Sequence, residues 1–177
     1  MNAPDLAAAA RAAVAAGLSV VLVEQPYRVA GRRSPAPAPQ LDAAWTAVLT
    51  ELRGDALAGV PVVTGGRSSG ARVACRTAAA TDAVGVLCLA FPVHPPGRPE
   101  RSRLDELDAV SVPVLVIQGE RDPFGMPPDA KGRTVVRLAG DHGLKADRAG
   151  LEAAVTAWLE GGWLSSASGN RRRAGAS

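Results

Sequence analysis

Residues 62–74 read VVTGGRSSGARVA, and this stretch decides the fold. An apolar run ends in two glycines, and a helix-like sequence follows a short turn. Gly66-Arg67-Ser68-Ser69-Gly70 fits the pattern G-x-S-x-G. Such a turn strains the backbone of its serine, and glycines two positions before and after it relieve the crowding. The register selects Ser68, because Ser69 would have an arginine at the crowded position before it. The stretch therefore predicts a strand, a tight turn and a helix, with Ser68 at the turn.

Apolar runs alternate with helix-like segments along the rest of the chain. Short continuous apolar runs are typical of strands buried on both faces of a parallel sheet. Strands are expected at residues 18–25, 60–66, 83–92, 112–119 and 134–140, and helices at 4–17, 41–54, 69–80, 102–110 and 145–162. This alternation predicts an α/β three-layer sandwich, with a mostly parallel sheet of about five strands and helices on both faces. Residues 1–164 are expected to form one domain and residues 165–177 a disordered basic tail.

Composition narrows the function classes. The chain has 177 residues and a net charge of +3, and three arginines of the tail carry much of the excess. Aromatic residues make up 3%, which argues against a base-stacking surface for nucleic acid. We find neither an apolar run long enough to span a bilayer nor a signal peptide at the start, and both cysteines lie in apolar segments. A cytoplasmic protein with buried, reduced cysteines and without nucleic-acid or membrane partners is expected; the sequence leaves the oligomeric state open.

A serine, an acid and a histidine each follow a predicted strand, in the order Ser68, Asp122, His142. The carboxyl ends of parallel strands meet at one edge of a sheet, and this chain order is that of serine hydrolases with this fold. In that arrangement His142 takes the Ser68 proton and Asp122 holds the imidazole. The backbone N–H of Ser69 faces the site as an oxyanion donor.

Each of these residues also has a structural interpretation. Ser68 could cap the helix, Asp122 could open an Asp-Pro turn, and His142 could be a loop histidine. Their coincidence at matching strand ends favours the triad. His94 is a rival base but follows a strand that comes too early, and Glu120 is a rival acid.

Other chemistries fit the sequence poorly. The segment GGRSSGA lacks the spacing and the lysine of a phosphate-binding loop. Two histidines and two buried cysteines do not make a metal site. We therefore expect neither a metal nor another cofactor. Cys75 lies two helical turns beyond Ser68 and is expected to pack, and the side chain of Asp141 should diverge from its neighbour. Four residues near strand ends are predicted to contact substrate: Tyr27, Arg28, Arg67 and His94.

The chain resembles α/β-hydrolases of the branch related to dienelactone hydrolases. More narrowly, it is similar to the hydrolase-like domain shared by testis-expressed proteins, NSL-complex subunits and bacterial homologues. The resemblance covers residues 3–160 and lies in VEQPYRVAGRR, LDAAW, GGRSSGARVACRTA, LAFPVHPPGRP, VPVLVIQGERDPFG and GDHGLK. It implies Ser68 as nucleophile, Asp122 as acid and His142 as base. The family includes hydrolases with no settled substrate and members that act as complex subunits.

The sequence departs from that family at its start. In α/β-hydrolases a central strand and a glycine-rich oxyanion loop precede the helix with which this chain begins. We therefore expect a truncated fold with an open slot between the strands at 18–25 and 60–66, poor expression or weak activity, and rescue of both by an upstream segment. The predicted function is hydrolysis of a small-molecule ester or related acyl bond through an acyl-enzyme on Ser68. The alternatives are a non-catalytic interaction module and a small-molecule binding protein.

Overall fold

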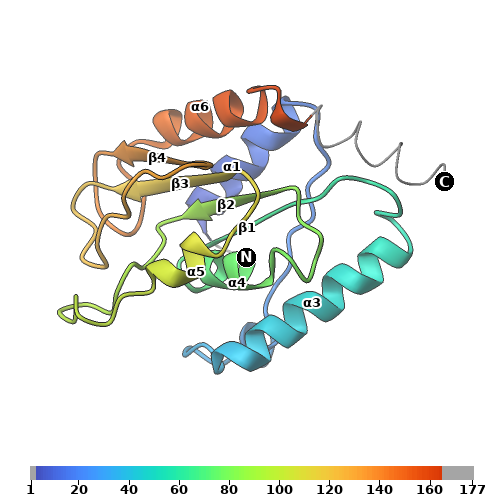
Figure 1. The fold of residues 1–177 in the computed structure, drawn as a ribbon, viewed down its shortest axis with the longest axis horizontal. Coiled ribbons are helices and arrows are strands. Elements are labelled where there is room, and N and C mark those ends of the chain that lie inside the picture. Colours follow the sequence, from blue (N-terminus) through green and yellow to red (C-terminus); the bar gives the residue numbers. More distant parts are fainter. Residues whose placement is uncertain (1–2, 165–177) are drawn as a thin grey trace.

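The computed structural model describes residues 3–164, and its centre is a parallel sheet of four strands. The strands are β1 (Val63–Arg67), β2 (Gly85–Leu89), β3 (Val114–Gly119) and β4 (Arg133–Leu138), and they lie in the sheet in chain order. Their carboxyl ends therefore share one edge, as the arrowheads in Figure 1 show. The tail predicted at residues 165–177 lies outside the described residues.

Helices cover both faces of this sheet, which confirms the α/β three-layer prediction. Helices α1 (Pro4–Ala15) and α6 (Arg148–Leu159) pack against each other on one face. The other face carries α4 (Ser69–Thr77) and α5 (Leu104–Asp108), and α3 (Ala38–Gly54) packs outside α4 (Figure 1). In the part of the chain that the structure describes, every helix is too short or too polar to cross a membrane.

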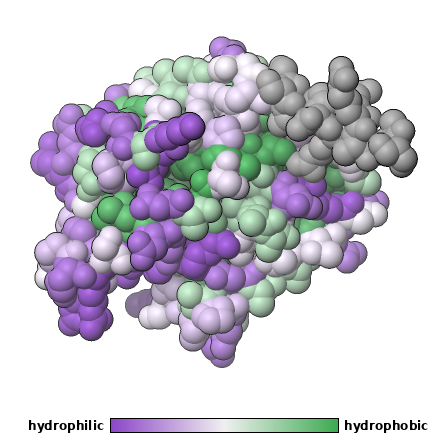
Figure 2. All heavy atoms as spheres, in the orientation of Figure 1, coloured by the Kyte–Doolittle hydropathy of each residue, from purple (hydrophilic) through white to green (hydrophobic). Residues whose placement is uncertain are grey.

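The core forms because successive side chains of each strand point to opposite faces of the sheet. Val86 and Cys88 of β2 join the cluster beneath α4 and α5, whereas Leu115 and Ile117 of β3 join the cluster beneath α1 and α6. All of β3 is buried, as a strand covered on both faces must be. In Figure 2, hydrophobic residues are exposed near the centre of the view, between the two layers of helices seen in Figure 1.

Ion pairs anchor α4, the helix that follows Ser68, to its neighbours. Arg76 on α4 lies 2.6 Å from Asp42 of α3 and 3.1 Å from Glu106 of α5. The hydrogen bond with Asp42 is the main cause that raises the pKa of Arg76 above its usual value. Arg72, one turn earlier, also pairs with Glu106 through two hydrogen bonds. These contacts fix the position of α4, and so of its first turn beside Ser68, relative to α3 and α5.

The strand predicted at residues 18–25 does not form, so the sheet has four strands where about five were expected. The segment has no regular secondary structure and belongs to no sheet ladder. Val21 and Leu22 are about half exposed, at 51% and 55%. The prediction was wrong because an apolar run becomes a strand only when a neighbouring strand satisfies its backbone groups. After this segment comes a short helix, α2 (Pro26–Val29), which was not among the predicted helices.

A cavity of about 470 Å³ lies between this segment and the edge strand β1. Residues 18–23 line one side of it and residues 60–66 another. Apolar side chains of α1, α3 and α6 complete the lining, among them Leu6, Leu49 and Leu159. The cavity therefore lies between two segments that the sequence predicts to be strands, of which the first does not form one.

Candidate active site

The turn after β1 holds Ser68 in a strained backbone, as the G-x-S-x-G pattern predicts. Its φ is +52° and its ψ −112°, a conformation that residues with a side chain rarely adopt. The backbone N–H of Ser68 donates to Leu89 O at the end of β2, at 2.9 Å. This bond ties the turn to the sheet and leaves the side chain at the sheet edge.

Only one of the two glycines flanking this turn is needed for steric reasons. A Cβ on Gly66 would lie 2.7 Å from the carbonyl oxygen of Gly70 and 2.9 Å from the N of Ala71, which are backbone atoms that cannot move aside cheaply. A Cβ on Gly70 would meet nothing within 4 Å. The expectation that both glycines relieve crowding is therefore right for Gly66 and wrong for Gly70, because the chain at Gly70 has already turned outward into α4.

The structure brings the three strand-end residues together. His142 Nε2 lies 2.9 Å from Ser68 Oγ, and His142 Nδ1 lies 2.8 Å from Asp122 Oδ2. Because an ionised carboxylate can only accept, Nδ1 carries the proton and Nε2 is left with a lone pair toward the serine. The Asp122 side chain is 1% exposed and that of His142 is 19% exposed. The arrangement is a hydrogen-bonded chain from a buried carboxylate to a serine hydroxyl.

Two further donors hold the Asp122 carboxylate. The backbone N–H of Phe124 donates to Oδ1 at 2.9 Å, and Gln118 Nε2 donates to Oδ2 at 2.9 Å. The loop that carries Asp122 can approach the His142 loop because Gly119 has no side chain. A Cβ there would come within 3.0 Å of the Gly140 carbonyl oxygen and still closer to the Asp141 carbonyl.

The other faces of His142 are also engaged. The Phe124 ring packs against the imidazole, with ring centroids 4.2 Å apart. Arg67 Nη2 donates to the His142 carbonyl oxygen at 3.0 Å, and Arg67 Nε donates to Asp5 Oδ2 at 2.6 Å. Asp5 is buried at the start of α1, so this pair joins α1, the Ser68 turn and the His142 loop. The Arg67 guanidinium is thus occupied by protein groups.

Ser68 opens into a cavity of about 800 Å³. Tyr27, Arg28 and Arg67, three of the four residues predicted to contact substrate, line it together with Ser69. Arg28 lies over the Tyr27 ring, 5.6 Å from its centroid. Ser69 begins α4, and the first N–H groups of a helix have no acceptor within it. Its N–H is therefore available to an oxygen in this cavity.

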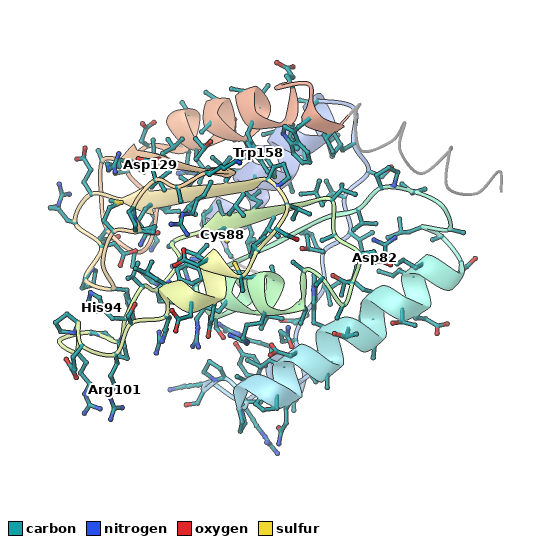
Figure 3. All side chains as sticks on the ribbon, viewed as in Figure 1. Asp82, Cys88, His94, Arg101, Asp129 and Trp158 are labelled. Carbon is teal, nitrogen blue, oxygen red and sulfur yellow. The ribbon has the colours of Figure 1, made fainter. Side chains whose placement is uncertain are left out.

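The remaining candidates lie elsewhere. His94, on the loop after β2, is not among the residues that line the Ser68 cavity. Its Nδ1 lies 2.9 Å from Pro95 O, and its ring packs on Gly125; Figure 3 labels it. Glu120 is exposed, and Asp141 accepts from the Gly143 N–H. Among the described residues no cluster of histidine, cysteine, aspartate or glutamate could hold a metal ion.

Both cysteines are buried in the core, as the sequence predicts. Cys75 Sγ on α4 lies 3.5 Å from Cys88 Sγ on β2. Figure 3 labels Cys88. The hydrogen bond between the two thiols, together with burial, raises the pKa of Cys88 well above its usual value. A thiol in this setting stays protonated and is a poor nucleophile.

Sequence reasoning missed Asp5, Gln118 and Phe124 as parts of this site. Gln118 had a signal, since it is the polar residue inside the apolar run VPVLVIQG. Asp5 had none, because its partner Arg67 is 62 positions away.

Comparisons with known proteins agree with this fold. Residues 1–154 match the family described as an alpha/beta hydrolase domain. No curated protein matches the sequence. Among solved structures, an α/β serine hydrolase without a lid from Xanthomonas campestris superposes with a TM-score of 0.69 at 24% identity, covering 90% of this chain and 73% of that one. An α/β serine hydrolase homologue from Coxiella burnetii gives a TM-score of 0.62 at 16% identity, covering 88% and 76%.

Proposed function

Because this chain belongs to the alpha/beta hydrolase domain family, we propose that it is a serine hydrolase that cleaves an ester or related acyl bond. The observation that carries the proposal is the hydrogen-bonded chain of Asp122, His142 and Ser68, with bonds of 2.8 and 2.9 Å. The chain ends at Ser68, which lines a cavity. The strained backbone of Ser68 supports it, since strain persists where the surrounding structure enforces it.

In the proposed reaction Ser68 Oγ attacks the acyl carbon while His142 Nε2 takes its proton. Asp122 keeps the other imidazole proton on Nδ1 and stabilises the imidazolium that forms. The Ser69 N–H, at the positive end of α4, donates to the oxyanion. The imidazolium then protonates the leaving alcohol, which leaves an acyl-enzyme on Ser68. Water, deprotonated by His142, hydrolyses this ester and restores the serine.

The substrate class of this site is a small ester that fits a cavity of about 800 Å³. Arg28, Arg33 and Lys145 line the cavity. Two acids also line it: Asp5 is paired with Arg67, and Glu24 has no ion pair among the described residues. A positive lining attracts an anionic group by raising its local concentration. We therefore propose that esters with a negative charge away from the scissile bond are preferred.

A fluorophosphonate probe tests the reaction, because it labels only an activated serine. We expect stoichiometric labelling of the wild type, mapped to Ser68 by peptide mass spectrometry. Ser68→Ala should abolish labelling. Ser69→Ala is the matched control, since its role uses a backbone N–H that the substitution keeps. Absence of labelling in a folded wild type would refute the hydrolase proposal and favour the non-catalytic interaction module.

A further inference from the structure

Gln118, the penultimate residue of β3, is fully buried among hydrogen-bond acceptors. Its Nε2 lies 3.0 Å from Phe91 O, 2.8 Å from Gly125 O and 2.9 Å from Asp122 Oδ2. An amide oxygen in the same place would face three acceptors. The orientation of the amide is therefore determined by its surroundings, with the two hydrogens of the NH2 group shared among Asp122 and the two carbonyls.

The opposite end of the same amide is unsatisfied. Gln118 Oε1 is buried and has no hydrogen-bond partner among the described residues. A buried amide oxygen without a partner is costly, and an apolar side chain of the same size would avoid that cost. Neighbouring β3 residues such as Val116 and Ile117 are apolar, as strands covered on both faces usually are. The N–H end of Gln118 must therefore do something that an apolar residue cannot.

The acceptor that distinguishes this site is Asp122 Oδ2. That oxygen also accepts from His142 Nδ1, so two donors converge on it while the Phe124 N–H holds Oδ1. The carboxylate is thereby fixed at both oxygens, and its free rotation about the Cβ–Cγ bond is lost. Of the described side chains bonded to this carboxylate, His142 is the titratable one, and Arg67 contacts the His142 carbonyl oxygen.

We propose that Gln118 is a positioning residue that holds the Asp122 carboxylate in the plane from which Oδ2 meets His142 Nδ1. The inference rests on the proposed function, because it assigns Gln118 a role in the same Ser68 site. Gln118 also joins the chain just after β2, through Phe91 O, to the loop at Gly125. It thus places the acid relative to the sheet without touching substrate.

The test compares Gln118→Met, which keeps the shape and removes the donors, with Ile117→Val in the same strand. Ile117 is equally buried but belongs to the cluster on the other face of the sheet. We expect Gln118→Met to lower kcat for p-nitrophenyl acetate by about 10–100-fold, by analogy with the loss of outer partners of metal ligands, with KM within about threefold. Ile117→Val should leave kcat within about twofold, although it destabilises the fold slightly.

A spectroscopic measurement separates this inference from the proposed function. The proton on His142 Nδ1, shared with Asp122, gives a downfield proton resonance that does not require turnover. Gln118→Met should shift or broaden it, and Ile117→Val should leave it in place. Should Gln118→Met fail to fold, Gln118→Asn, which withdraws the amide from Asp122 by one methylene, takes its place in both assays. Unchanged kcat or an unmoved resonance would overturn the positioning role, whereas an inert wild type with a shifted resonance would overturn the hydrolase proposal alone.

Discussion

Replacing Asp122 by asparagine probes the proposed triad most directly. The two carboxylate oxygens each face a donor that cannot move: the Phe124 N–H at Oδ1 and the Gln118 amide at Oδ2. An asparagine NH2 group therefore meets a donor in either orientation. When it occupies the Oδ2 position, His142 must present an acceptor at Nδ1, and its proton moves to Nε2. That tautomer cannot take the Ser68 proton.

The expected loss in kcat is about 10⁴-fold, the size seen when a triad imidazole is held in the wrong tautomer, which corresponds to about 5.4 kcal/mol of transition-state stabilisation. KM should change little, because Asp122 is buried and does not line the Ser68 cavity. Steady-state hydrolysis of p-nitrophenyl acetate, checked by the rate of fluorophosphonate labelling, measures the loss.

Glu120→Gln is the matched control, since it makes the same chemical change two positions earlier on an exposed side chain. We expect it to keep activity within about twofold, as surface substitutions usually do. An Asp122→Asn protein that folds and stays within about tenfold of wild type would refute the role assigned to Asp122.

Further predictions concern the turn, the buried ion pair and the cavity. Gly66→Ala should lower the free energy of unfolding by about 1–3 kcal/mol, because its Cβ would press on the Gly70 backbone, whereas Gly70→Ala should be neutral; equal denaturant midpoints would contradict the steric argument. Arg67→Met should cost about 1–3 kcal/mol in chemical denaturation, because buried Asp5 loses its partner, and Arg28→Met is the control; a stable Arg67→Met protein would show that Asp5 is not held as described. An anionic ester should have a higher kcat/KM than a neutral one of equal size at low salt, with the difference shrinking at high salt; equal values at low salt would leave the cavity arginines and lysine as solvated surface.

The order of strands and helices could be predicted from the sequence because each apolar run and each break is a local signal. Ser68 could also be predicted, because five consecutive residues specify its turn, and so could the strand ends after which Asp122 and His142 come. In a parallel sheet all carboxyl ends meet at one edge, so strand-end positions alone bring these three residues near one another.

What only the tertiary structure decided depends on partners that are distant in the chain. Residues 18–25 have the composition of a strand, but a strand needs a neighbour for its backbone groups, and the local sequence cannot say whether one is there. Arg67 lines the Ser68 cavity as predicted, but only the fold shows that its guanidinium also bonds Asp5 and the His142 carbonyl. In the sequence, Gln118 is a polar residue within an apolar run. Only the fold shows that its amide donates to the Asp122 carboxylate. Periodicity and turn chemistry act over a few residues, whereas the partners of buried polar groups are set by how the whole chain packs.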